Sequence, residues 1–356
     1  MKTGVANLPL HYGKTPLWLF QRMQRLAREI TIFIVSEFSN EEMLKRLSDP
    51  FWFQAFGCVL GFDWHSSGLT TTVCGALKEG IKGLERDLGL FVAGGKGKVS
   101  RCTPNEIEKF ADIASFDPQH LIYASKMSAK VDSAALQDGY QLYHHTFIFT
   151  KSGSWGVIQQ GMNERNRYAR RYHWLSSELK DFVCEPHFGI CSDSIEERVL
   201  NMVADEAFEA RSISTHLSKE KPDKLLIELK KLKNLELPSY HQVLIRDLHP
   251  DRLNKIFLKT YEEQPNNFEE LLGIPGVGPK TIRAISLISE IIYGASPSFR
   301  DPVRFSFAHG GKDGHPYPVN REGYDQSIEI LRTAISSSKI GNREKIDAIK
   351  RLQGII

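Results

Sequence analysis

The sequence predicts an α+β protein with two parts. An N-terminal α/β domain (residues 1–190), which contains an antiparallel hairpin or sheet, precedes an all-helical domain (residues 191–356) that contains a helix-hairpin-helix. Residues 140–160 place aromatic and β-branched residues on both sides of a Lys-Ser-Gly-Ser turn, which is typical of a β-hairpin. From residue 194 onward, apolar residues recur at helical spacing in successive runs.

Length and composition set the broad class of the protein. At roughly 100–200 residues per domain, a chain of 356 residues corresponds to two or three domains. No run reaches about 18 apolar residues and the N-terminus lacks a signal-peptide pattern, so we expect a cytoplasmic location and no membrane partner. The five cysteines are scattered without a CxxC pair, which favours a reducing compartment and argues against zinc.

Before the hairpin, the sequence predicts helices joined by loops. Residues 16–48 carry apolar residues at helical spacing, and Ser39 or Asn40 is placed to cap the second of two helices. A further helix is expected to begin in the TTTVCGALKEG run. The GGKGK run at residues 94–98 predicts a loop, because glycine-rich segments favour turns.

After the hairpin, the sequence predicts helices. Ser194 and Glu197 form a capping box before a long helix that we expect to reach about Ser214. The charged, proline-containing stretch 218–224 predicts a linker before a helical module. Two more helices are expected in the tail, residues 322–356.

The strongest local motif is the run FEELLGIPGVGPKTIRAISLISEIIYG, residues 268–294. A turn at Gly276-Val277-Gly278 separates two helices, and the proline that follows occupies the first helical position, where its missing N–H costs nothing. Glycine lets the backbone approach a phosphate, and the free N–H groups at a helix start favour an anion. We therefore expect Gly276 and Gly278 to contact the DNA backbone; a glycine-rich corner in a helical bundle is the alternative.

Lys280 follows this turn, and Asp301 lies just past the second helix. The PGVGPKT run, residues 275–281, resembles the helix-hairpin-helix DNA glycosylases, including endonuclease-III-like and oxoguanine-type enzymes. The resemblance implies that Lys280 forms a Schiff base with the sugar, that Asp301 assists, and that no cofactor is needed. The gap between the two is longer than in that family, so a phosphate-binding role for Lys280 and a capping role for Asp301 are alternatives.

A basic and aromatic run accounts for the formal net charge, which is only +3. Residues 161–174 hold four arginines and one glutamate, so the rest of the chain is balanced. Arginines mixed with aromatic rings are typical of surfaces that hold single strands or flipped bases. The side chains expected to contact DNA are Arg165, Arg167, Arg170, Arg171, Tyr172 and Trp174. A solvated basic face is the alternative.

A second candidate site lies around the hairpin, where polar residues are frequent: Lys126, Lys130, His144, His145, Gln159 and Gln160. Successive side chains on a strand point to opposite faces, so only one of the two histidines can face a site on the sheet. A metal-dependent nuclease would hold Mg²⁺ or Mn²⁺ with Asp132, Asp138 and Asp63, helped by a histidine or lysine. The alternative is a sheet with capping aspartates and packed histidines.

Five long runs resemble the protein family known as domain of unknown function 763: residues 8–23, 46–80, 128–145, 159–174 and 307–319. The family occurs mainly in archaea and thermophilic bacteria, and the resemblance implies no particular reaction. It extends into the glycine- and proline-rich stretch 305–318, which predicts either a functional insert or a rigid connector.

Three functions follow from these patterns. The first is a DNA-repair enzyme of glycosylase/lyase type that cleaves at a damaged or modified nucleotide flipped out of the duplex. The second is a metal-dependent DNA endonuclease with its site in the N-terminal domain. The third is a DNA-binding protein without enzymatic activity. The near-neutral net charge favours local DNA contact over a broad basic surface.

Overall fold

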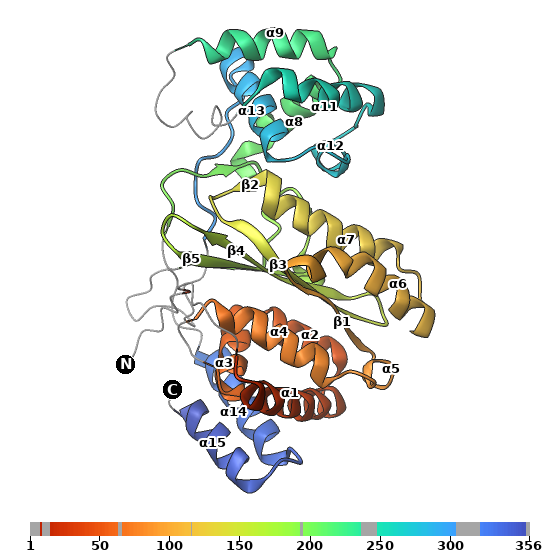
Figure 1. Cartoon of the computed structure of the whole chain (residues 1–356), viewed down its shortest axis with the longest axis vertical. Coiled ribbons are helices and arrows are strands. Elements are labelled where there is room, and N and C mark those ends of the chain that lie inside the picture. Colours follow the sequence, from red (N-terminus) through yellow and green to blue (C-terminus); the bar gives the residue numbers. More distant parts are fainter. Residues whose placement is uncertain are drawn as a thin grey trace.

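The computed structural model describes residues 8, 15–62, 66–114, 116–192, 195–235, 248–303 and 321–353. A central antiparallel sheet lies between two groups of helices (Figure 1), which confirms the predicted α+β fold class. In these ranges, no helix combines the length and apolar character that crossing a membrane would require.

The central sheet has the strand order β1-β3-β4-β5-β6, and each neighbouring pair is antiparallel. Its strands are β1 (Leu90–Lys96), β3 (Gln141–Thr150), β4 (Trp155–Asn163), β5 (Tyr168–Leu175) and β6 (Gly189–Cys191). Strands β3 and β4 form the predicted hairpin, because their β-branched and aromatic residues pair across a short turn.

Both faces of this sheet are buried, and its residues alternate between two cores. On β3, Phe147 and Phe149 enter one core, whereas Ile148 enters the other. On β5, Trp174 and Leu175 divide in the same way. The alternation between the two cores follows from the two-residue period of a strand. It explains why the sequences of these strands contain continuous apolar runs.

Polar side chains also alternate, and they form two rows across the sheet. The pocket row consists of His145, Gln159 and Tyr172, which are paired in register on β3, β4 and β5. The sealed row consists of the neighbouring residues on the opposite face, namely His144, Gln160 and Arg171. The register of the strands therefore separates the two histidines and the two glutamines.

Helices from both ends of the chain cover the sealed-row face. They are α1 (Leu17–Glu37), α2 (Asn40–Ser48), α3 (Pro50–Leu60), α4 (Gly68–Gly80), α14 (Arg321–Ser337) and α15 (Asn342–Gln353), with the short α5 (Glu85–Leu88) beside β1. Ser39 caps α2 by accepting from the Glu42 N–H at 3.0 Å, as predicted. The two predicted tail helices form, and they pack on α1 and α3, away from the other helices of the predicted second domain (Figure 1).

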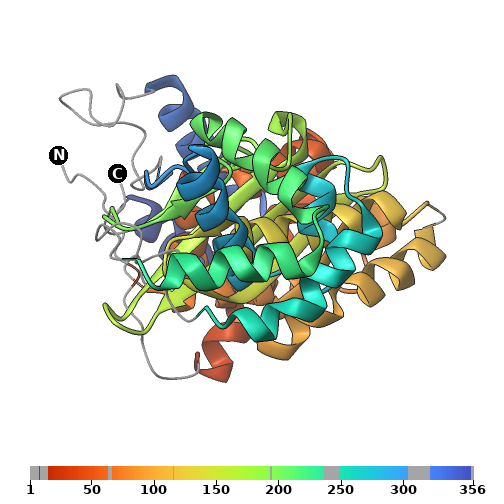
Figure 2. The same ribbon diagram turned by 90° about the horizontal axis from the view of Figure 1, so that it is seen from above.

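The pocket-row face is covered first by η1 (Gly97–Cys102), α6 (Thr103–Ala114), α7 (Gln119–Lys130) and the π-helical turn η2 (Val131–Ala135). Above them lie η4 (Asp205–Ala207), α8 (Phe208–Ser218), α9 (Pro222–Lys233), α11 (Pro250–Glu263), α12 (Phe268–Gly273) and α13 (Pro279–Tyr293), seen from above in Figure 2. A small antiparallel ribbon of β2 (Leu136–Gln137) and β7 (Leu200–Asn201) lies between these two groups of helices. The short helix η3 (Ser176–Glu178) follows β5. One continuous apolar core joins η2 and the α-helices of this face to the sheet.

Two local predictions are wrong. The run 94–98 is not a simple loop, because β1 continues to Lys96; Gly94, at φ +85°, passes so close to β3 that a Cβ would lie 2.3 Å from the His145 carbonyl oxygen. The predicted helix from Ser194 to Ser214 does not form as a unit. Residues 200–201 pair with β2 instead, and the α-helix α8 begins only at Phe208. Ser194 itself lies outside the described residues.

Candidate functional site

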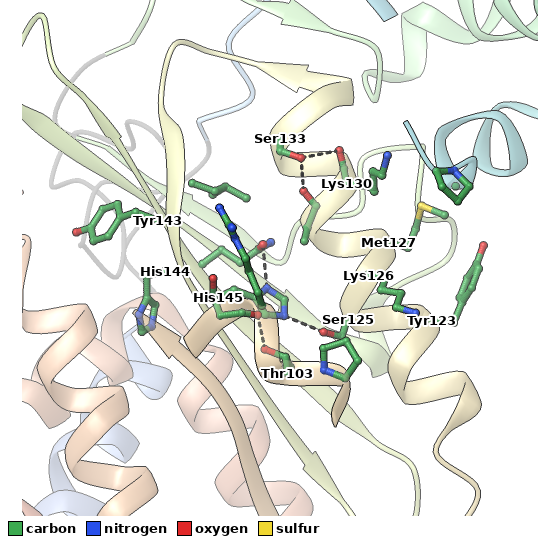
Figure 3. A pocket seen from close by; sticks show the side chains of 18 residues that line it. Thr103, Tyr123, Ser125, Lys126, Met127, Lys130, Ser133, Tyr143, His144 and His145 are labelled. Atoms are coloured by element: carbon green, nitrogen blue, oxygen red, sulfur yellow. Dashed lines mark hydrogen bonds between the residues drawn. The ribbon is translucent and has the colours of Figure 1, made fainter. Parts of the chain in front are cut away.

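An open pocket of about 880 Å³ lies between the sheet and the turn that follows α12 (Figure 3). Its walls come from η1, α6, α7 and β3, and Gly273 and Pro275 close it on the side of the turn. Its charged and ring-bearing residues include Arg101, Lys126, Lys130, Tyr123, Tyr143 and His145. The pocket thus combines positive charge, aromatic surface and a titratable base.

Helix α7 and the turn η2 divide their side chains between the pocket and the sheet. Residues three or four apart share a helix face. Lys126, Lys130 and Ser133 stand on the outer side, where they are exposed or half-buried. Ser125 and Asp132 face the sheet and are only 2% and 1% exposed, and Ser125 also lines the pocket. The wider π-helical turn holds Asp132, and such turns are frequent at functional sites.

His145 connects Ser125 to the sheet. Its Nε2 lies 2.9 Å from Ser125 Oγ, and its Nδ1 lies 3.0 Å from Gln159 Oε1. The Gln159 amide nitrogen donates to the carbonyl of Ser128 at 3.3 Å and to Asp132 Oδ2 at 2.5 Å, so its oxygen must face the imidazole as an acceptor. The proton of His145 therefore lies on Nδ1, and Nε2 accepts the hydroxyl hydrogen of Ser125.

Asp132 is held by three donors inside the core. Its Oδ2 accepts from Gln159 and from Trp174 Nε1 at 2.9 Å, and its Oδ1 lies 2.5 Å from His187 Nε2. A buried carboxylate needs such partners because its desolvation is costly. Asp132 consequently fixes Gln159, which in turn fixes the ring of His145.

The two histidines of β3 have different surroundings (Figure 3). His145 points toward Ser125; burial lowers its pKa, although Gln159 and Asp132 oppose this effect, so the ring is a neutral base. His144 points to the opposite face, where its Nε2 lies 2.9 Å from Thr146 Oγ1. Burial lowers the pKa of His144 to about 3.

Two side chains of α7 attach the α12–α13 region to the pocket wall. Lys130 donates from Nζ to the carbonyl of Val277, and burial lowers the pKa of Lys130. The Tyr123 hydroxyl donates to Glu269, and burial together with that carboxylate raises the pKa of Tyr123, which keeps it a donor. The turn is therefore held at the rim of the pocket by contacts far apart in the sequence.

The turn between α12 and α13 has the backbone geometry that its glycines permit. Gly276 has φ +102°, a region that disfavours side chains, and a Cβ there would lie 2.7 Å from Ile256 Cδ1. Gly278 is the N-cap of α13 in an extended conformation, and a Cβ there would meet its nearest neighbour at 3.9 Å. Pro279 occupies the first turn of α13, and Lys280 is exposed.

The model of the family described as protein of unknown function (DUF763) matches residues 4–319. The chain belongs to this family. Neither a curated protein nor a solved structure matches the chain. The family match confirms the resemblance seen in the five sequence runs, and it spans the pocket and the turn. The family match gives no support to the resemblance between this chain and the helix-hairpin-helix glycosylases.

Asp301 forms a buried ion pair with Arg170. The guanidinium donates Nη1 to Asp301 Oδ1 at 3.0 Å and Nη2 to Oδ2 at 2.8 Å, and the Glu196 N–H adds a third bond at 2.6 Å. Lys280 stands on the exposed start of α13. The lyase pair expected from the sequence is therefore not assembled, because the carboxylate is buried in a bidentate ion pair with another cation.

The basic run divides into an exposed tip and a buried strand. Arg165 and Arg167 lie exposed in the turn between β4 and β5. The other four residues of this run that were expected to contact DNA lie on β5 and are fully buried: Arg170, Arg171, Tyr172 and Trp174. They bond to core partners from both sheet faces, so they offer no surface to a nucleic acid.

Two of the three aspartates expected to hold a metal, Asp132 and Asp138, are each engaged by separate donors. Asp132 is held by Gln159, Trp174 and His187, as described above, whereas Asp138 accepts from Arg170 at 2.9 Å and from the Tyr172 hydroxyl at 2.7 Å. Asp63 lies outside the described residues, as does the stretch 305–318. Within the ranges the structure describes, no group of three or more His, Cys, Asp or Glu side chains is arranged to hold a metal ion.

Sequence reasoning missed Ser125 and did not join it to His145. The doubled histidines and glutamines at 144–145 and 159–160 were visible, and their strand spacing predicted that one of each pair shares a face. Nothing in the sequence around Ser125 separates it from an ordinary buried helix residue. The 20 residues between it and His145 are bridged only by the packing of α7 on β3.

Proposed function

We propose that this protein binds DNA, with the backbone held on the turn between α12 and α13 and one extruded nucleotide held in the adjacent pocket. The carrying observation is that Gly273 and Pro275 of that region line the same pocket as Lys126 and Lys130. Several classes of DNA-repair enzyme act on an extruded nucleotide, so we place the protein among DNA-repair proteins.

The turn supplies the features that a phosphate needs. Gly278 leaves the approach to the start of α13 open, and Lys280 adds an exposed cation next to it. The backbone N–H groups of a first helical turn point outward, and the helix dipole favours an anion there. Such contacts position the duplex and carry no information on sequence.

The pocket has the size and chemistry for one nucleotide. Its volume of about 880 Å³ is within the range of small-ligand sites. Tyr123 offers a ring for stacking on a base, while Arg101, Lys126 and Lys130 offer positive charge to its phosphate. The free cysteines of the described chain fit a reducing cytoplasm, which we propose as the location.

The proposal assigns no reaction to Lys280 or to a metal ion. Asp301 is paired with Arg170, so a lyase step through Lys280 would lack its carboxylate. The nuclease alternative would need Asp132 and Asp138 together, and each is engaged by its own donors.

Fluorescence anisotropy with two duplexes tests the proposal. One duplex is fully paired, and the other has the same sequence with a single extrahelical nucleotide, which we expect to bind more tightly. Gly278→Ala should weaken both complexes about tenfold without changing thermal stability, because a Cβ fits the fold but obstructs a phosphate. Lys126→Ala should reduce the preference for the extrahelical nucleotide.

The matched control is Lys82→Ala, because Lys82 is also a well-exposed lysine and lies just after α4, on the opposite side of the sheet. Its loss should leave both affinities unchanged. Binding that responds equally to Lys82→Ala and Lys126→Ala, or no binding at low salt, would contradict the proposal.

A further inference from the structure

Ser125 and His145 form a hydrogen-bonded pair at the pocket floor that DNA binding alone does not require. The serine hydroxyl lies 2.9 Å from the imidazole Nε2. The orientation of Gln159 places the ring proton on Nδ1, so the lone pair of Nε2 faces the serine. A hydroxyl next to a base, with the base oriented by a third group, is the general arrangement of an activated nucleophile.

We propose that Ser125 is a nucleophile, activated by His145, that attacks a phosphodiester bound in the pocket. Gln159 and Asp132 are positioning residues, because they act on the reacting atoms only through the ring of His145. The four side chains come from α7, β3, β4 and η2, and each link between them is a hydrogen bond.

Ser133 shows why the pairing of Ser125 matters. Both serines line the pocket, and both belong to the α7–η2 segment. The Ser133 hydroxyl donates to the carbonyl of Ala129 at 2.7 Å, so its hydrogen is held by a group that cannot remove it. The hydrogen of Ser125 is held by an imidazole nitrogen. Ser133 is therefore a matched control within the same pocket.

The step balances within the groups present. Ser125 Oγ forms a bond to phosphorus as its proton passes to His145 Nε2, and the phosphorus–oxygen bond to the leaving group breaks. The leaving oxygen takes the proton from Nε2. Water then attacks phosphorus in this serine phosphodiester and gives its proton to the same nitrogen. The bond from phosphorus to Ser125 Oγ breaks, Oγ takes that proton, and a phosphate monoester leaves.

The choice of a phosphodiester rests on the proposed function and on the charge of the pocket. Arg101, Lys126 and Lys130 line it and would offset the charge that develops on the phosphoryl oxygens. The reactivity of Ser125 itself does not depend on DNA binding, so the two proposals are tested separately.

Labelling of the full chain with a fluorophosphonate tests the nucleophile. This reagent forms a bond to an activated serine oxygen and releases fluoride, and peptide mass mapping identifies the site. We expect labelling at Ser125 that Ser125→Ala abolishes, that His145→Gln slows by about 100-fold or more, and that Ser133→Ala leaves unchanged. Wild-type protein without label at Ser125, or a His145→Gln protein labelled as fast as wild type, would overturn the proposal.

Turnover of bis(4-nitrophenyl) phosphate tests the substrate class. Release of nitrophenolate that disappears in Ser125→Ala supports a phosphodiesterase, whereas a labelled Ser125 with no such turnover overturns that class. DNA affinity is measured on the same preparations. DNA binding without labelling would overturn the catalytic inference alone, and labelling without DNA binding would overturn the proposed function alone.

Discussion

The pocket row and the sealed row begin with the same residue types, yet their surroundings differ. His145 and Gln159 meet Ser125 beside an open pocket. In the sealed row, Gln160 donates to the Ser67 carbonyl at 2.8 Å and accepts from Thr70, under the cover of α4. Identical pairs of residues thus give a candidate site on one face and a structural network on the other, and the covering helices decide which.

The largest expected effect concerns the buried arginines of β5. Arg170→Met should lower the free energy of unfolding by about 3–5 kcal/mol, because it leaves the carboxylates of Asp138 and Asp301 buried without their cation. Arg171→Met, on the sealed row, should cost about 1–3 kcal/mol, because its partners His173 and Gln54 are neutral acceptors. Urea denaturation measures the free energy of unfolding of both variants. Equal losses would contradict the expected difference between Arg170 and Arg171.

A second expected effect separates the two glutamines. Gln159→Leu should slow fluorophosphonate labelling by about 10- to 100-fold, because His145 loses the acceptor that fixes its proton on Nδ1. Gln160→Leu should leave the rate unchanged in protein that remains folded. Since Gln159 raises the pKa of His145, its removal should also shift the acid limb of the rate to lower pH. A purely structural role for Gln159 would leave that limb in place.

The pH dependence of the wild-type labelling rate tests the state of His145. Its ordinary pKa of 6.5 is lowered by burial, and only the neutral ring accepts a proton. The acid limb of the rate should therefore have its midpoint below pH 6.5. The charged or titratable groups around it are Asp132 on η2, Lys126 and Lys130 on α7, Arg101 on η1 and His144 on β3. A midpoint of the acid limb at or above pH 6.5 would contradict a lowered pKa.

The smallest expected effect concerns the two glycines of the turn. Gly276→Ala should destabilise the protein by about 1–2 kcal/mol, because φ is +102° and the new Cβ would approach Ile256. Gly278→Ala should leave thermal stability unchanged, because its backbone is extended and uncrowded. Differential scanning calorimetry compares them, and a reversed order would show that the turn has a different backbone geometry.

Local patterns predicted much of the fold but little of the candidate site. The alternation along β3 and β4 predicted the hairpin, and Ser39 predicted the start of α2, because both depend on neighbours in sequence. The burial of Arg170 depends on Asp138 and Asp301, which lie 32 and 131 residues away. The charge pattern along the chain does not show such distant partners. For this reason the sequence predicted that the arginines of β5 are exposed.

The predicted helix from Ser194 was wrong for a related reason. A capping box and helical spacing favour a helix locally, but Leu200 and Asn201 pair with β2. Asn201 also donates from its backbone N–H to the Ser298 carbonyl at 2.8 Å. These distant backbone partners stabilise a strand where the local sequence favours a helix.

The most direct test of the central claim compares two single substitutions on adjacent residues of β3. Fluorophosphonate labelling of Ser125 is measured in His145→Gln and in His144→Gln, with folding checked by near-ultraviolet circular dichroism. We expect His145→Gln to lower the rate by about 100-fold or more and His144→Gln to leave it unchanged, because only His145 Nε2 contacts the serine hydroxyl. Equal rates in the two folded variants would contradict the assignment of Ser125 and His145 as a reacting pair.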